Sequence, residues 1–156
     1  MLLRLLAAGT RMPDWVNDGY AEYASRLKHD YKLELKEIPL GQRTGVDTSR
    51  AVEKEGERML TLLDPRAYIV ALQVTGRAMT TEELARFLET RANQGTSAID
   101  FCIGGPDGIA PSVDARAHYR WSLSTLTLPH GLVRVIAAEA LYRAVSVIKR
   151  LPYHRQ

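Results

Sequence analysis

The sequence predicts an α/β fold with a mainly parallel sheet flanked by helices. Two short apolar runs, residues 68–74 and 98–103, have the uninterrupted composition of parallel strands that are covered on both faces. Helical patterns separate these runs from the other predicted strands, and such alternation is typical of parallel sheets. Because we find no repeat, low-complexity tract or interdomain linker, we expect residues 1–156 to form a single domain.

The chain begins with a predicted strand at residues 2–8. Gly9 and Thr10 form a turn after this strand, and a helix follows. Pro13 opens this helix, since proline suits the first helical turn. The apolar side chains that follow recur on one helical face. They are Val16, Tyr20, Tyr23, Ala24 and Leu27.

Residues 32–38 alternate charged with apolar side chains, which indicates a strand with one solvated face, near an edge of the sheet. Residues 41–46 then form a polar loop with two glycines and Arg43, and a charged helix follows at residues 47–63. We interpret the loop as a connector, and contact with RNA through this basic loop is the alternative.

Thr80 and Glu83 have the spacing of a capping box, so they predict the start of a helix that stops near Gly95. Residues 121–129, WSLSTLTLP, alternate apolar with hydroxyl side chains, and we expect them to begin as a strand and become a hydroxyl-rich loop. A predicted turn at residues 129–131 leads into a long helix at residues 132–150.

This last predicted helix is apolar on two sides. One stripe contains Val133, Ile136, Ala137, Ala140, Leu141, Ala144, Val147 and Ile148, and the other contains Leu132, Val135, Ala138, Tyr142 and Val145. A helix with two apolar sides must be buried on both, and in so short a chain a second subunit can provide the second cover. We therefore expect a homodimer through this helix.

The stretch IGGPDG, residues 103–108, follows a buried strand, where glycine often lets backbone N–H groups approach a nucleotide. The glycine spacing is not G-x-G-x-x-G, Pro106 lacks the N–H that a phosphate would use, and no Walker lysine follows. A triphosphate or dinucleotide site is therefore disfavoured. Two interpretations stay open from these residues: one wall for an adenosine ligand without phosphate, and a tight turn between strand and helix.

The sequence offers no metal-site pattern. Cys102 is the only cysteine, so it forms no intrachain disulfide and is interpreted as a small core hydrophobe. The histidines have neither paired spacing nor carboxylate neighbours in a ligand pattern, so we expect no metal. They are His29, His118, His130 and His154. With no signal-like leader and no apolar run near the roughly 20 residues of a membrane span, we expect a cytoplasmic protein without a membrane partner.

Basic charge gathers in the last third of the chain. Residues 109–156 contain seven basic and two acidic residues, a net charge of +5, whereas residues 1–108 carry −2. This asymmetry suggests a polyanionic partner, although a solvated basic face is the more common explanation. In the tail, Tyr153 and Arg155 can stack on or pair with a base, and His154 can exchange a proton near neutral pH. A frayed tail is the alternative, but Pro152 stiffens the exit from the helix.

Six blocks of sequence together resemble one protein family. They are GTRMPDW (9–15), EKEGERML (53–60), IGGPDG (103–108), WSLSTLTLPHGLVRV (121–135), EALYRA (139–144) and PYHR (152–155). In this order, and over nearly the whole chain, they are similar to the bacterial ribosomal RNA large-subunit methyltransferase H family. That family belongs to the SPOUT class of S-adenosylmethionine-dependent enzymes and methylates N3 of a pseudouridine.

The resemblance implies a SPOUT fold with a C-terminal trefoil knot, adenosylmethionine held by the knot loops, and an obligate homodimer. Periodicity could not have predicted the knot, since general topology rules argue against threaded chains. Carried over position by position, the implied cofactor site comprises nine residues. They are Leu72, Gly104, Gly105, Ser124, Thr125, Leu126, Thr127, Leu128 and Pro129.

The implied substrate is a pseudouridine of 23S ribosomal RNA in a helix-capping loop at the decoding face, on the assembled 70S ribosome rather than bare RNA. Recognition through shape and phosphates suits so small a domain. The candidates for phosphate contact, each with the alternative of an ordinary helix-surface charge, are Arg134, Arg143, Arg150 and Arg155. For Arg143 the alternative is a pair with Glu139, four residues earlier.

Methyl transfer from a sulfonium needs alignment of the two reactants and removal of the N3 proton. We favour His154 for the proton, with Tyr153 and Arg155 orienting the base, and His130 is the alternative. Asp107 stands where the family has glutamate more often, and residues 42–50 match the family only loosely, so no functional residue is assigned there. Two alternative functions stay open. One is a SPOUT methyltransferase that acts on transfer RNA or another ribosomal site, and the other is a noncatalytic ribosome-binding module.

Overall fold

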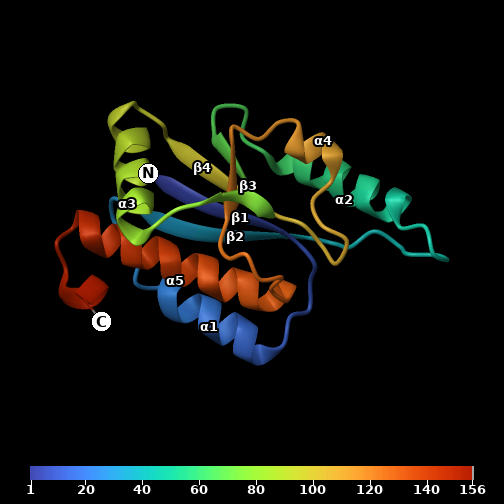
Figure 1. Cartoon of the computed structure of the whole chain (residues 1–156), viewed down its shortest axis with the longest axis horizontal. Helices are drawn as coiled ribbons and strands as arrows, with labels where there is room; N and C mark the ends of the chain where they lie inside the picture. Colours follow the sequence, from blue (N-terminus) through green and yellow to red (C-terminus); the bar gives the residue numbers. More distant parts are fainter. Residues whose placement is uncertain (156) are drawn as a thin grey trace.

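The computed structural model describes residues 1–155, and Gln156 lies outside the described residues. Its strands form one sheet in the order β2-β1-β4-β3-β5, and every neighbouring pair runs parallel (Figure 1). The strands are β1 (Leu2–Ala8), β2 (Lys32–Ile38), β3 (Tyr68–Ala78), β4 (Ala98–Ile103) and β5 (Tyr119–Ser122). The α/β class with a parallel sheet is therefore confirmed, and the single-domain organisation and the trefoil knot stay predictions.

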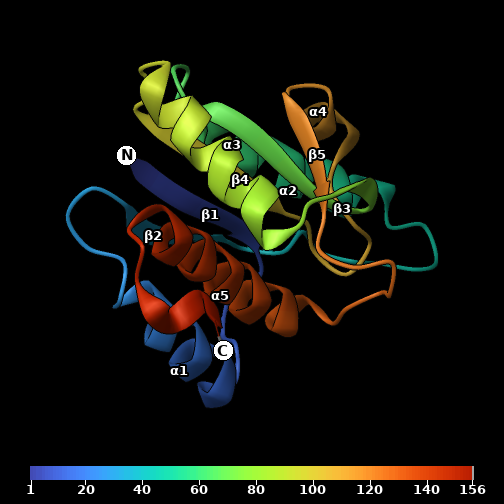
Figure 2. The same ribbon diagram turned by 60° about the vertical axis from the view of Figure 1, so that its left-hand side comes forward.

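Helices cover both faces of this sheet. They are α1 (Asp14–Ala24), α2 (Ser49–Leu62), α3 (Thr81–Asn93), α4 (Pro111–Asp114) and α5 (His130–Ile148), and the 3₁₀ helix η1 (Pro152–Arg155) follows them. On one face α5 lies between α1 and α3, whereas α2 and α4 cover the other face (Figure 2). All connections between parallel strands thus pass over a face of the sheet, as crossovers in α/β folds do.

Two apolar cores result, one on each face. In β4 all residues are buried, and Phe101 packs into the core beneath α1, α3 and α5, whereas Cys102 packs into the core beneath α2 and α4. This alternation is the period of two of a β-strand, and it explains why the central strands are apolar throughout. Cys102 is confirmed as a core residue, and burial raises the pKa of its thiol to about 12.

Most element predictions are confirmed at their expected places. The edge position of β2 is observed, and Thr80 and Glu83 form the capping box of α3, with the Glu83 N–H donating to Thr80 Oγ1 over 3.1 Å. The helix predicted from residue 47 begins at Ser49, because the Asp47 carboxylate accepts hydrogen bonds from the Ser49 N–H and hydroxyl in a local turn. Two short helices, α4 and η1, are found where no helix was predicted.

The predicted turn at residues 129–131 is wrong. Pro129 is the N-cap of α5, and His130 and Gly131 already belong to its first turn. A side chain at Gly131 would stand 2.8 Å from Cγ2 of Val16, so α1 and α5 can approach each other only because this position is glycine. The helix therefore starts two residues earlier than its apolar pattern indicates.

Within one chain, α1 and α3 cover much of both apolar stripes of α5. Ala138 and Val145 of the second stripe are buried, and Val135 lies against Gly19 of α1. Burial within the chain thus explains part of these stripes, since Leu132 and Ile136 stay partly exposed. The homodimer stays a prediction that needs support from another feature. Within residues 1–155, no helix combines the length and the apolar composition that crossing a bilayer requires.

Candidate active site

One large cavity of about 690 Å³ lies at the carboxyl ends of β3, β4 and β5. This volume is in the range of small-molecule sites, and in open parallel sheets such sites lie at this edge. Three segments line it: residues 72–75, residues 103–109 and residues 121–130 except Ser122 and Thr125, joined by Val133 of α5. Segments far apart in the sequence therefore form a single site.

Eight of the nine residues assigned to the cofactor line this cavity, and Thr125 does not. Thr125 lies in the exposed part of the hydroxyl-rich loop, next to Ser124. The loop is shaped by its own hydroxyls, because Ser122 Oγ donates to the Ser124 carbonyl over 2.9 Å and Ser124 Oγ accepts from the Leu126 N–H over 3.0 Å. Binding of a cofactor by these residues stays a prediction.

The β3 wall of the cavity is irregular. Leu72 and Arg77 both pair with Trp121 of β5, so residues 73–76 bulge out of the strand pairing. A Cβ at Gly76 would stand 2.7 Å from the Arg120 carbonyl oxygen, so this glycine allows the two backbones to meet. The bulge places Gln73, Val74 and Thr75 in the cavity lining, and sequence reasoning missed all three.

The glycine turn forms the opposite wall. The Gly108 N–H donates to the Gly105 carbonyl over 3.0 Å, which closes a tight turn around Pro106 and Asp107. A Cβ at Gly104 would lie 2.3 Å from the backbone of Gly108, and one at Gly105 would lie 2.9 Å from the Glu55 carboxylate. Packing against backbone thus requires glycine at position 104, a different reason from approach to a ligand, whereas the neighbours of Gly105 are side-chain ends that can shift.

A basic clamp holds this turn from outside. Arg43 Nε donates to Asp107 over 2.8 Å, and its Nη1 donates to the buried carboxylate of Glu55 over 2.8 Å. Glu55 also accepts from the Gly41 N–H over 2.9 Å. Because Arg43 is bound to two carboxylates, it acts within the fold, and the interpretation of residues 41–46 as a connector is favoured over an RNA contact through Arg43.

His130 and Arg134 join the cavity to three other segments. His130 Nδ1 lies 2.9 Å from the Gly104 carbonyl oxygen, and Arg134 Nε donates to His130 Nε2 over 3.1 Å. Arg134 is fully buried and also donates to Glu37 over 2.6 Å and to the Gly9 carbonyl over 2.8 Å. One guanidinium thus connects the ends of β1 and β2 to α5, and through His130 to the end of β4.

This network fixes the tautomer of His130. A carbonyl oxygen can only accept, so Nδ1 carries the proton, and Nε2 must be unprotonated because Arg134 donates to it. With both nitrogens engaged, His130 has no atom free to take a proton from a substrate. Burial, and then the Arg134 charge, lower the pKa of His130 below its usual 6.5 and keep the ring neutral.

A pH dependence follows from this lowered pKa. Above pH 6.5 the ring is neutral in both folded and unfolded chains, so its contribution to stability is complete. As the pH falls from 6.5 toward the lowered pKa, the unfolded chain binds a proton that the folded chain does not, and stability declines. We expect the melting temperature of the wild type to fall over this window more steeply than that of His130→Asn. Equal slopes in thermal melts across this pH range would contradict the assignment.

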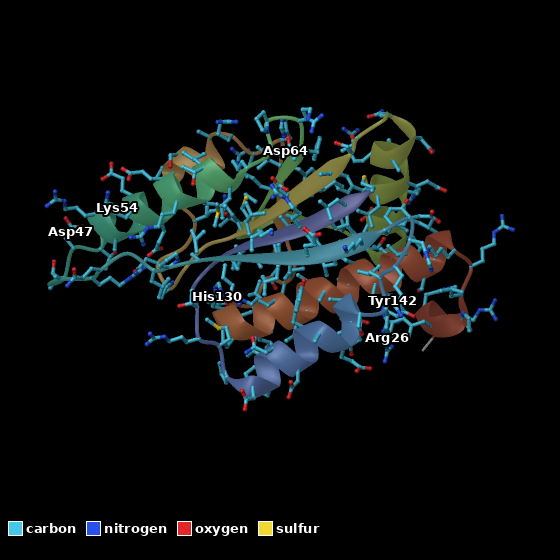
Figure 3. The ribbon with its side chains drawn as sticks, turned by 180° about the vertical axis from the view of Figure 1, so that it is seen from behind. Arg26, Asp47, Lys54, Asp64, His130 and Tyr142 are labelled. Atoms are coloured by element: carbon cyan, nitrogen blue, oxygen red, sulfur yellow. The ribbon has the colours of Figure 1, made fainter. Side chains whose placement is uncertain are left out.

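The predicted catalytic residues lie away from the cavity. Tyr153, His154 and Arg155 form η1, and Tyr153 OH donates to Glu139 of α5 over 3.1 Å. Glu139 is nine residues beyond His130, or about 14 Å of helix rise. None of the three residues lines the cavity. Figure 3 shows the separation, with His130 at one end of α5 and Tyr142 and Arg26 toward the other.

The tail is nevertheless held in place. The Tyr153 ring lies 4.7 Å from that of Tyr142, and the guanidinium of Arg143 lies 4.8 Å from the Tyr153 ring centroid. Burial and the Glu139 charge raise the pKa of Tyr153 to about 12, so its phenol stays protonated. Within residues 1–155, the buried Nδ1 of His154 has no hydrogen-bond partner. A fixed position is therefore favoured over a frayed tail.

Known proteins match this chain over its whole length. A family model described as "Predicted SPOUT methyltransferase" matches residues 1–154. The chain belongs to the SPOUT methyltransferase family. A protein from Pseudomonas putida (strain W619) is 48% identical to it over 156 residues, covering 99% of this chain and 100% of the relative, and is named "Ribosomal RNA large subunit methyltransferase H". Proteins of the same name from Pseudomonas paraeruginosa (strain DSM 24068 / PA7) and Pseudomonas aeruginosa (strain LESB58) are 47% identical with the same coverage.

The prediction of a phosphate contact by Arg134 in this SPOUT methyltransferase is wrong, because the side chain is fully buried by its three acceptors. Arg143 pairs with Glu139 over 2.7 Å, as the alternative for this residue proposed. Arg150 and Arg155 are exposed, so they stay candidates. An i,i+4 pair can be recognised from sequence, whereas the burial of Arg134 depends on segments far away in the chain.

The cavity of this family member suits an adenosine ligand without phosphate. Its lining is mostly apolar side chains and backbone, and the titratable residues in it are Asp107 and His130. It contains no lysine or arginine, so phosphate binding is disfavoured, and its one carboxylate, Asp107, is already paired with Arg43. No group of three or more potential metal ligands occurs within residues 1–155.

Proposed function

We propose that this chain transfers a methyl group from S-adenosylmethionine to N3 of a pseudouridine in 23S ribosomal RNA, on the assembled ribosome in the cytoplasm. Membership of the SPOUT methyltransferases supports the reaction class, and the names of the full-length relatives support large-subunit ribosomal RNA as the substrate. The proposal goes beyond this support in three details. They are the pseudouridine, its helix-capping loop at the decoding face, and the intact 70S ribosome as the substrate.

The cavity carries the proposal. Eight residues that the resemblance assigns to the cofactor converge on one space of about 690 Å³ without a phosphate-binding cation. Adenosylmethionine supplies a methyl group made electrophilic by its sulfonium. Leu72 and Gly104 would hold it from opposite walls, with Ser124 and residues 126–129 on the third side, and His130 would keep the Gly104 carbonyl in place.

The chain's own part in the chemistry is alignment and proton removal. His154 is the proposed acceptor of the N3 proton, since both ring nitrogens of His130 are already engaged. Tyr153 and Arg155 would orient the base or its phosphate. Removal of the proton leaves N3 of the pseudouridine with the lone pair that attacks the methyl group.

This assignment requires a second copy of the chain. Within one chain η1 is fixed on Glu139, Tyr142 and Arg143, away from the cavity. We therefore propose a homodimer in which the tail of one chain completes the cavity of the other, as C2 pairing through α5 would allow. The separation of cavity and tail is the feature that supports the dimer, in place of the second apolar stripe.

The test is a product map. Purified full-length protein is incubated with intact ribosomes that lack the modification and with methyl-labelled adenosylmethionine, and the label is located by mass spectrometry. We expect one label at N3 of a pseudouridine in large-subunit RNA from 70S ribosomes. Label in transfer RNA or at another ribosomal position would support the alternative SPOUT substrate, and absence of both label and cofactor binding would support a noncatalytic ribosome-binding module.

A further inference from the structure

The connection between β1 and α1 contains a strained, unpartnered arginine. Arg11 has φ of 58°, the left-handed region that residues with a side chain adopt at a cost. Its side chain is exposed, and within residues 1–155 it has no hydrogen-bond or ion-pair partner. Backbone strain of this kind persists only where the surroundings impose it, so the conformation needs an explanation.

The surroundings hold both ends of this connection. The Gly9 N–H donates to the Ile38 carbonyl over 2.8 Å, and the Gly9 carbonyl accepts from the buried guanidinium of Arg134 over 2.8 Å. On the other side of Arg11, Asn17 Nδ2 donates to the Met12 carbonyl over 3.2 Å. Arg11 is thus pointed away from the fold by anchors on the residues around it.

The connection also lies beside the cavity. A Cβ at Gly9 would stand 3.7 Å from Nε2 of His130, which lines the cavity, and Figure 3 shows this connection passing the His130 end of α5. Four residues after Arg11, in the first turn of α1, the indole of Trp15 is 58% exposed. An unpaired guanidinium and an exposed indole therefore occupy one edge near the cavity.

We propose that Arg11 and Trp15 form an RNA-binding rim, in which Arg11 contacts a phosphate and Trp15 stacks on an unpaired base next to the reacting nucleotide. A guanidinium and an aromatic face are the groups that recognise single-stranded RNA. The inference rests on the proposed function and adds residues that contact its RNA substrate.

Arg11 is tested by the salt dependence of binding. The affinity of the full-length protein for unmodified ribosomes is measured by co-sedimentation over a range of salt concentrations. We expect Arg11→Ala to weaken binding about fivefold and to reduce the slope of log K against log salt by about 0.7–0.9, the share of one phosphate contact. Arg86→Ala is the matched control, since Arg86 is an exposed arginine of α3 in the middle of a regular helix. It should leave both values unchanged.

Two further variants separate an effect on RNA binding from an effect on folding. Arg11→Gly removes the side chain together with the strain, so it should reproduce the loss of binding while melting at or above the wild-type temperature. Trp15→Ala should weaken binding about tenfold with an unchanged salt slope, and Trp15→Phe should restore most of the affinity.

The outcomes are distinguishable from failure of the proposed function. All variants should bind adenosylmethionine as the wild type does, and wild-type methylation of large-subunit RNA is scored separately. An unchanged salt slope for Arg11→Ala overturns the phosphate contact. If Trp15→Ala lowers the oligomer mass in light scattering without changing ribosome affinity at equal dimer concentration, a subunit interface replaces the RNA rim.

Discussion

His154→Ala is expected to reduce the rate of methyl transfer about a hundredfold to a thousandfold while leaving the affinity for adenosylmethionine unchanged. Loss of a positioned proton acceptor has an effect of this order. Cofactor affinity should persist because His154 does not line the cavity. The measurement is single-turnover methylation of unmodified ribosomes, together with calorimetric titration of the cofactor. Full activity of the variant would exclude His154 as the proton acceptor.

Mixed dimers test whether the tail acts on the partner's cavity. Leu128→Arg places a cation in the cavity lining and should block binding of a sulfonium. If η1 acts across the dimer, a mixed dimer of Leu128→Arg and His154→Ala chains contains one intact composite site, although each homodimer is inactive. We expect about half of the wild-type activity from purified mixed dimers. If the tail acted on its own chain, every site would carry a defect and the mixed dimer would be inactive.

Arg134→Met is expected to lower the free energy of unfolding by about 1–3 kcal/mol, the range for leaving a buried acceptor without its donor. Methionine approximates the length of arginine but leaves Glu37, the Gly9 carbonyl and His130 Nε2 without their donor. Glu37 is partly exposed, so water can replace part of its lost hydrogen bonding. The arginine site is fully buried, so water can reach it only if the packing of α5 against β1 opens.

The matched control is Arg143→Met, an arginine on the same helix that pairs with Glu139 and lies over the Tyr153 ring. Both side chains of that pair are one-quarter exposed, so a loss below about 1 kcal/mol is expected. Urea unfolding of the two variants gives the comparison. Equal losses for the two variants would show that the buried network contributes no more than a surface pair.

Much of the fold could be predicted because its determinants are local. Uninterrupted apolar runs indicate β3 and β4, the alternation of charge indicates the edge strand β2, and Thr80 with Glu83 indicates the start of α3. The glycine turn and the hydroxyl-rich loop were also located correctly, because glycine and short polar side chains have local conformational preferences. Those preferences, however, did not reveal that Gly104 packs against the backbone of Gly108.

The site depended more on contacts between distant segments. Arg134 lies among apolar residues near the start of α5, and no pattern of its neighbours identifies its partners. Its three acceptors come from β2, from the end of β1 and from the helix itself. The bulge in β3 that contributes Gln73 depends on pairing with β5, almost fifty residues later. Neither feature follows from a pattern of neighbouring residues.

By itself the sequence determined the strands, the long helices, the family and most of the segments that form the cavity, since these follow from periodicity and from short ordered blocks. The tertiary structure decided that Arg134 is an internal anchor rather than a phosphate contact, that Arg11 points outward in a strained conformation, and that the tail is held away from the cavity of its own chain. The physical reason is that burial and hydrogen-bond partners belong to pairs of segments brought together by folding, and a single segment does not encode its partner.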